Sequence, residues 1–102
     1  MNIIGICGSL REKSYNHFAL MAAAKAMPAG MTLRMVSLKD IPMYNQDVQN
    51  AGFPAVVQSL AQEILNADGV LIASPEYNFS FSGVLKNALD WCARMDPVPF
   101  KH

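Results

Sequence analysis

Three short apolar runs stand out against the more polar stretches of this chain and predict its strands. Ile3–Cys7 and Val70–Ala73 are continuous runs that end at Gly8-Ser9 and Ser74-Pro75. Strands that are covered on both faces lose the alternation of half-exposed strands, so both runs predict buried strands. Met31–Leu38 alternates well enough to predict a third strand.

Apolar residues at helical spacing predict three helices, over Asn16–Met27, Ala55–Asn66 and Gly83–Arg94. The faces expected to be buried carry Phe18, Met21, Ala22 and Ala26 in the first, Val57, Leu60, Ala61 and Ile64 in the second, and Val84, Leu85, Ala88 and Cys92 in the third. Asp40–Pro54 is rich in proline, glycine and amide residues and predicts a long loop. Asp96–His102 predicts an unstructured tail.

Strands and helices alternate along the whole chain, which predicts an α/β fold with a parallel, doubly wound sheet. Residues 1–102 are expected to form a single domain. In such sheets ligands bind outside the carboxyl ends of the strands, near the topological switch point. The loops expected there are Ser9–Asn16 and Pro75–Gly83.

Composition narrows the class of function. Eight basic residues balance eight acidic ones, and 52% of the 102 residues are apolar. The apolar fraction is typical of a folded domain, and the balanced charge gives no reason to expect nucleic acid or an anionic membrane as a partner. No apolar stretch approaches the ~18 residues of a membrane span.

Cys7 and Cys92 are the two cysteines, and neither belongs to a C-x-x-C pair. We expect two reduced thiols in a cytoplasmic protein. His17 and His102 have no Asp, Glu or Cys partner at metal-ligand spacing, so no metal site is expected. No nucleophile motif is present, and no catalytic side chain is assigned.

The loop after the first strand favours an anion site. Gly8 permits a close turn, and the first N–H groups of the following helix lack intrahelical partners. Ser9, Ser14 and Asn16 add neutral hydrogen-bond donors, and Arg11 adds a guanidinium that can donate two charge-assisted hydrogen bonds. The alternative is that Ser14 or Asn16 only caps the helix while the basic side chains are solvated.

The loop after the third strand carries aromatic residues where solvent is expected. Tyr77, Phe79 and Phe81 stand close together, and backbone N–H groups with the Asn78 amide offer donors to the edge of a flat ring. The alternative is that these aromatics fill a dimer interface. Glu76 is either a general acid or base, or a solvated or paired carboxylate.

Both loops together resemble the NADPH-dependent FMN reductases, a flavodoxin-like group with azo-dye, quinone and chromate reductases among its relatives. The resemblance rests on Gly8-Ser9-Leu10-Arg11-x-x-Ser14-x-Asn16 and on Pro75-Glu76-Tyr77-Asn78-x-Ser80-x-x-Gly83-x-Leu85-Lys86-Asn87-Ala88-x-Asp90-Trp91. It extends to Leu38–Asp47 and Ala67–Ile72, and so covers nearly the whole chain.

This resemblance implies non-covalently bound FMN as cofactor, reduced by NADPH, which then passes electrons to a small acceptor such as a quinone, azo compound, metal oxyanion or free flavin. Residues that match the family's phosphate-binding positions are Ser9, Arg11, Ser14 and Asn16. Those that match the segment along the flavin ring are Pro75, Glu76, Tyr77 and Asn78, with Gly83 near its edge.

Family members have five parallel strands, whereas this sequence predicts only strands 2-1-3 of that order and three helices, as if truncated at the C-terminus. Val70–Ala73 then becomes an edge strand, which favours association with another chain, for example as a homo-oligomer. Two hypotheses remain: an FMN-dependent reductase, or a flavodoxin-like fragment without turnover that acts only in association or has no activity.

Overall fold

The computed structural model describes residues 1–100. Its main sheet has three parallel strands in the order β2-β1-β3, as the sequence predicted. They are β1 (Asn2–Cys7), β2 (Thr32–Val36) and β3 (Gly69–Ala73). Within residues 1–100 four helices accompany them where three were expected: α1 (Tyr15–Lys25), α2 (Gln46–Asn50), α3 (Ala55–Asn66) and α4 (Gly83–Cys92).

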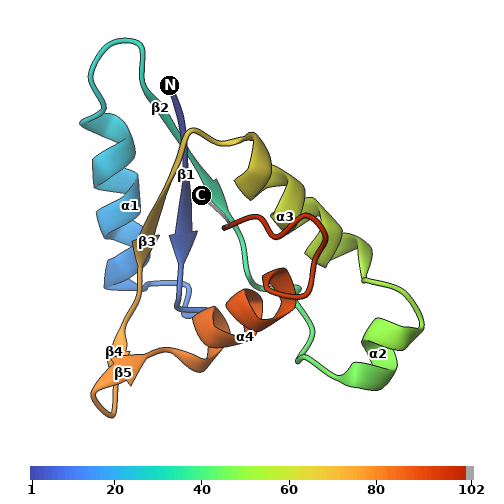
Figure 1. Cartoon of the computed structure of the whole chain (residues 1–102). Coiled ribbons are helices and arrows are strands. Elements are labelled where there is room, and N and C mark those ends of the chain that lie inside the picture. The colour runs from blue at the N-terminus through green and yellow to red at the C-terminus, as the bar shows by residue number, and fades with distance from the viewer. Residues whose placement is uncertain (101–102) are drawn as a thin grey trace.

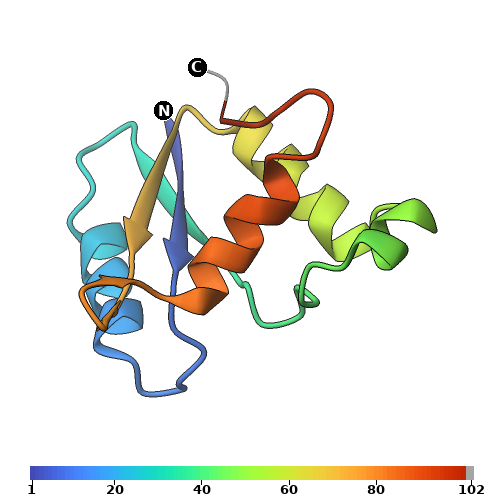
Figure 2. The ribbon, with the colours of Figure 1, turned by 60° about the horizontal axis from the view of Figure 1, so that its bottom comes forward.

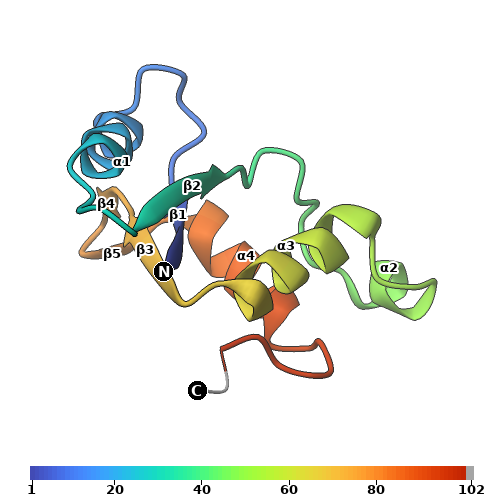
Figure 3. The ribbon, with the colours of Figure 1, turned by 90° about the horizontal axis from the view of Figure 1, so that it is seen from above.

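The helices cover the sheet on both faces. α1 lies on one face, and α3 and α4 lie together on the other (Figures 1 and 3). On β1, Ile4 and Ile6 belong to the core beneath α3 and α4, whereas a Cβ on Gly5 would lie 3.3 Å from Leu20 of α1. Cover on both faces is the reason why β1 is apolar from Ile3 to Cys7.

Burial agrees with the expected stripes on two helices and disagrees on the third. All four residues expected on α3 are buried, and on α4 Leu85, Ala88 and Cys92 are buried. On α1 the expected stripe is wrong, because Leu20 is the buried residue while Phe18 and Met21 are exposed. α1 is apolar nearly all round, so its sequence has no distinct stripe that marks the buried side.

One short helix and one two-stranded hairpin were missed in regions expected to be loops. α2 lies within Asp40–Pro54 and projects away from the sheet (Figures 1 and 3). β4 (Glu76–Tyr77) and β5 (Ser80–Phe81) form an antiparallel hairpin after β3. After α4 no helix or strand follows up to residue 100, and Pro99 is buried; Lys101 and His102 of the expected tail lie outside the described residues.

Candidate functional site at the carboxyl ends of the strands

The predicted loops meet at one end of the sheet. All three strands run in the same direction, and the loop after β1 and the hairpin after β3 both lie at their carboxyl ends (Figures 1 and 2). Gly8 N–H donates to the carbonyl of Ala73 at 2.8 Å, so the two loops leave the sheet side by side. This is the edge where open α/β sheets bind ligands.

Gly8 is required by packing. A Cβ at this position would lie 2.8 Å from Oγ of Ser74 and 2.9 Å from Oγ of Ser82. Ser82, itself buried, donates its hydroxyl to the Gly8 carbonyl at 2.5 Å and accepts from Leu85 N–H at 3.3 Å. Ser82 therefore joins the start of α4 directly to the loop after β1, which is the candidate phosphate site. The sequence did not mark Ser82 as a site residue.

The N-terminus of α1 is open to an anion. Ser14 occupies the N-cap position and is 3% exposed, yet within the described residues its side chain accepts no hydrogen bond from the first turn. Its Oγ instead lies 4.0 Å from the Cys7 sulfur. The interpretation of Ser14 as a helix-capping residue alone is thus not what the geometry shows, and the first-turn N–H groups stay available to a ligand.

The other phosphate candidates surround this helix end. Ser9 Oγ accepts from Arg11 N–H at 3.3 Å, which braces the turn. The Arg11 guanidinium carbon lies 5.6 Å from the centre of the Tyr15 ring, a distance at which a cation and an aromatic face attract. Asn16 lies half-buried in the first turn of α1. Ser9, Arg11, Ser14 and Asn16 thus stand on one loop and one helix start.

A cavity of about 310 Å³ lies between this loop and the end of β2. Ser9, Arg11 and His17 line it from one side, and Lys39 lines it from the loop after β2. Lys39 was not identified from the sequence, although its place just beyond the carboxyl end of a strand is a signal that marks such residues.

The second loop is a tight hairpin. Asn78 and Phe79 occupy its turn with φ values of 54° and 67°, the left-handed region that favours glycine. Glu76 accepts a hydrogen bond from Phe79 N–H through its carboxylate, so the carboxylate helps to hold the turn. Phe79 is fully exposed, and Tyr77 and Phe81 are about half exposed.

Gly83 stands apart from Pro75, Glu76, Tyr77 and Asn78. It lines a second cavity, of about 290 Å³, which the other four do not line. The structure therefore places the four along the hairpin at the same end of the sheet, and Gly83 beside a hollow at the start of α4.

Asn87 and Trp91 hold the loop after β2 against α4. Asn87 Oδ1 accepts from Tyr44 N–H at 2.7 Å, and its amide donates to the carbonyl of Pro42 at 2.9 Å. Trp91 Nε1 donates to the same carbonyl at 2.8 Å. Asn87, one of the motif residues of the family resemblance, is 9% exposed and positions this loop.

Cys7 is the last residue of β1, and Cys92 is the last residue of α4. Cys7 and Cys92 are both free thiols, and burial raises the pKa of Cys92 to about 11. Within residues 1–100 no three His, Cys, Asp or Glu side chains gather as a metal site would require. Over the same residues, no helix has the length and apolar character needed to cross a membrane.

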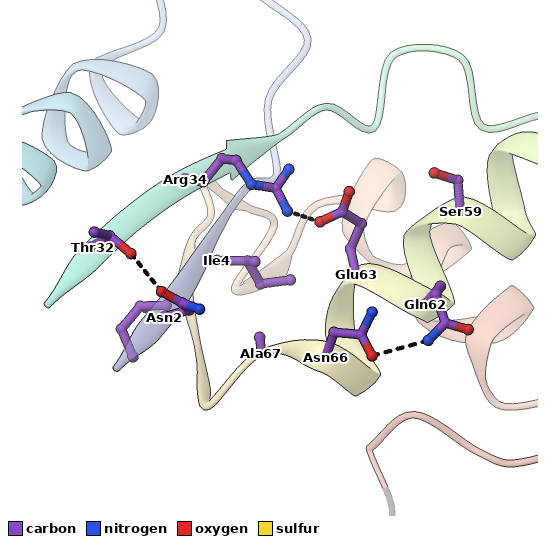
Figure 4. Close-up of a pocket in the computed structure, with 10 residues that line it drawn as sticks. Asn2, Ile4, Thr32, Arg34, Ser59, Gln62, Glu63, Asn66 and Ala67 are labelled. Carbon is purple, nitrogen blue, oxygen red and sulfur yellow. Dashed lines mark hydrogen bonds and ion pairs between the residues drawn. The ribbon is translucent and has the colours of Figure 1, made fainter.

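A larger cavity, of about 650 Å³, lies at the opposite ends of the strands and contains none of the predicted site residues (Figure 4). Asn2 and Thr32 line it from the sheet, and the Arg34–Glu63 ion pair joins β2 to α3 across it. Because parallel α/β sheets bind ligands at their carboxyl ends, size alone does not make this cavity the functional site.

The family model of the NADPH-dependent FMN reductases matches residues 1–102 of the chain. The chain belongs to this family. It is 46% identical over 100 residues to an NAD(P)H-dependent FMN reductase of Pseudomonas aeruginosa, covering 98% of this chain and 54% of that protein. It is 45% identical over 101 residues to a quinone reductase of Escherichia coli K12, covering 97% of this chain and 54% of that protein.

Solved structures agree with the family fold. The flavoenzyme NAD(P)H:(acceptor) oxidoreductase FerB of Paracoccus denitrificans superposes with a TM-score of 0.85 at 34% identity, over 96% of this chain and 53% of FerB. The expected flavodoxin-like arrangement of strands 2-1-3 is confirmed. The chain spans about half the length of these relatives.

The first loop fits the FMN that the family name implies. A phosphate ester needs open N–H donors and a cation. The start of α1 provides the donors and Arg11 provides the charge. The cofactor expectation and the donor set thus agree.

Proposed function

We propose that this chain binds FMN at the carboxyl ends of its strands and belongs to an enzyme that reduces a small acceptor with NAD(P)H. The observation that carries the proposal is the uncapped N-terminus of α1 beside Arg11. The names of the relatives support a flavin-linked reductase, with quinones as one class of acceptor.

Each residue of the first loop has a distinct role in this proposal. Arg11 pairs with the phosphate, and N–H groups of the first turn of α1 donate to its oxygens. Ser9 keeps the loop in shape through its hydrogen bond from Arg11 N–H, and the Ser14 hydroxyl reorients from Cys7 toward the phosphate. Asn16 adds an amide donor from the first turn.

The hairpin and Gly83 form the other side of the proposed site. Pro75, Glu76, Tyr77 and Asn78 lie along the flavin ring, with the Asn78 amide and backbone N–H groups toward its heteroatoms. FMN, when bound, supplies the hydride and electron chemistry, and the protein supplies orientation and hydrogen bonds. This division fits a site to which no catalytic side chain is assigned.

The proposal includes a cytoplasmic location and a homo-oligomer, with no nucleic-acid partner. The exposed β3 edge supports the homo-oligomer, since a strand edge with apolar side chains favours pairing with another chain.

A flavin titration tests the proposal. We expect the purified chain to quench FMN fluorescence on binding. Arg11→Ala should weaken FMN binding roughly 10- to 100-fold, the effect of one charge-assisted hydrogen bond, and leave riboflavin binding unchanged because riboflavin lacks the phosphate. Lys25→Ala, at the far end of α1, is the matched control and should bind both flavins normally.

Two results of the flavin titration would contradict the proposal. An equal loss for both flavins would reject the phosphate role of Arg11. Wild-type protein that binds no FMN and oxidises no NADPH would favour the other hypothesis, a flavodoxin-like fragment without turnover that acts only in association or has no activity.

A further inference from the structure

Ser82 lies where three parts of the candidate site meet. It directly follows the β4–β5 hairpin, occupies the N-cap position of α4 and contacts the loop after β1. Its backbone N–H donates to Oγ of Ser74 at 3.3 Å, and Ser74 directly follows β3, so this hydrogen bond joins the two ends of the hairpin segment. A buried polar side chain whose hydrogen bonds reach several elements restricts how those elements move relative to one another.

The Gly8 carbonyl depends on this serine. Ser82 donates its hydroxyl to that carbonyl at 2.5 Å, and within residues 1–100 no other donor reaches it. Gly8 is buried, and its N–H donates to the carbonyl of Ala73 at 2.8 Å. Residues next to the hairpin segment therefore hold both polar groups of Gly8. A buried carbonyl that loses its donor costs free energy unless the backbone moves to reach another.

Gly8 in turn sets the start of the loop that carries the proposed phosphate site. Ser9 follows it directly, and Ser9 Oγ accepts from Arg11 N–H at 3.3 Å. The proposed phosphate site thus begins one residue after the carbonyl that Ser82 holds. The residues proposed to lie along the flavin ring belong to the segment that Ser82 closes. One hydroxyl therefore joins two halves of the candidate site that are far apart in the sequence.

From this arrangement we infer that Ser82 is a positioning residue that couples the two halves of the FMN site by holding the phosphate loop against the hairpin segment. The phosphate and the ring of FMN belong to one molecule, so both ends bind tightly together only when the two subsites are already correctly placed. The inference rests on the proposed function and deepens it. It concerns the binding of FMN alone and adds no chemical step.

Titration of the full chain with two flavins tests the inference. FMN occupies both halves of the site, whereas riboflavin lacks the phosphate and reports on the ring half alone. We expect Ser82→Ala to lower the ratio of FMN affinity to riboflavin affinity by roughly 3- to 10-fold, the effect of one lost hydrogen bond. Ser59→Ala, which changes an exposed serine on α3, is the matched control and should keep the wild-type ratio.

The affinity ratio separates positioning from stability. Both flavins titrate the same folded population, so a variant that only unfolds in part weakens both affinities by the same factor and keeps the ratio. Ser82→Gly is the second variant, because glycine at an N-cap position costs a helix little while the hydroxyl is still removed. It should lower the ratio as Ser82→Ala does. A wild-type ratio in either variant would overturn the inference.

A double-mutant cycle with Arg11→Ala gives a further readout. Since Ser82 is inferred to act by placing the phosphate loop, its removal should matter less once Arg11 no longer pairs with the phosphate. Ser82→Ala should therefore weaken FMN binding less in the Arg11→Ala background than in the wild type. Independent losses, whose fold-changes simply multiply, would show that the two residues are not coupled and would overturn the inference.

The same titrations distinguish failure of this inference from failure of the proposed function. Wild-type protein that binds FMN more tightly than riboflavin, with a ratio that neither Ser82 variant changes, defeats the inference and leaves the proposed function intact. Wild-type protein that binds neither flavin defeats the proposed function and the inference together.

Discussion

Asn87 is the residue through which α4 controls the loop after β2. Its side chain joins two backbone groups of that loop, Tyr44 N–H and the Pro42 carbonyl, and it is nearly buried. Removing this side chain leaves Tyr44 N–H without its partner, whereas the Pro42 carbonyl keeps the hydrogen bond from Trp91 Nε1. An unpaired, partly buried N–H costs more than losing an exposed contact.

We predict that Asn87→Ala lowers the free energy of unfolding by about 1–3 kcal/mol, because two partly buried hydrogen bonds to the loop are lost. Lys86→Ala is the neighbouring control, since it removes only an exposed ion pair with Asp90, worth at most about 0.5 kcal/mol. Urea unfolding of both variants measures the difference. Equal costs would show that Asn87 does not anchor the loop.

Cys92 gives stability a dependence on alkaline pH. Burial raises the pKa of its thiol from 9.0 to about 11, so between these values the unfolded chain releases a proton that the folded chain keeps. Stability from this group is complete below pH 9 and is lost as the pH rises toward 11, at a slope of at most about 1.4 kcal/mol per pH unit. Urea unfolding from pH 8 to 11 should show a shallower decline for Cys92→Ala than for the wild type. Parallel curves would contradict the assignment.

At the scale of elements, the helices and strands that could be predicted from the sequence are those with a long apolar pattern. The bounds of β1, β3 and α3 were predicted to within a residue, because a continuous or strictly periodic apolar run leaves a clear pattern. The expected burial of β3 is wrong, since none of its residues is buried. α2 was missed because five residues are too few for a helical period, although Asn45 accepts from Asp47 N–H in the manner of a helix cap. The start of α4 was predicted, but its contact with Gly8 through Ser82 joins residues 74 positions apart and leaves no local pattern.

The candidate site also has parts that a local sequence pattern predicts and parts that depend on contacts between distant residues. Its location at the carboxyl ends was predictable from the order of elements, and the phosphate-loop residues from their spacing and family resemblance. The two cavities depend on how Leu10, Leu38 and Lys39 converge from separate loops. Such convergence is a tertiary property, so Lys39 was not found.

The β4–β5 hairpin was missed because its turn is Asn78-Phe79, where Asn-Gly is the usual signal. Phe79 is fully exposed, so it gains no packing for the strain of its positive φ. We predict that Phe79→Gly is more stable than Phe79→Ala by about 0.5–1 kcal/mol, as only glycine adopts this φ freely. Both variants remove the same exposed ring, so their difference in urea unfolding isolates the backbone. A more stable alanine variant would show that the turn is not strained.

At the scale of the whole molecule, the β3 edge of the sheet has no neighbouring strand within residues 1–100. Within residues 1–100, β3 pairs only with β1, and Leu71 and Ile72 on β3 are 39% and 41% exposed. Phe18 and Met21 on α1 add further exposed apolar surface. A strand edge with apolar side chains on it is a template for association with another chain.

We predict that the 102-residue chain self-associates through this edge. Sedimentation velocity should show a weight-average mass above 11.2 kDa that rises with concentration. The double variant Leu71→Lys, Ile72→Lys should shift the distribution of sedimentation coefficients toward the monomer. Two charges would have to be buried for the strands to pair. Val48→Lys, a substitution of an exposed apolar residue on the distant α2, is the control for added charge and should not change association. A sharp monomer of the wild type with cooperative unfolding would contradict the prediction, since it would mean that the three-stranded sheet tolerates its open edge in water.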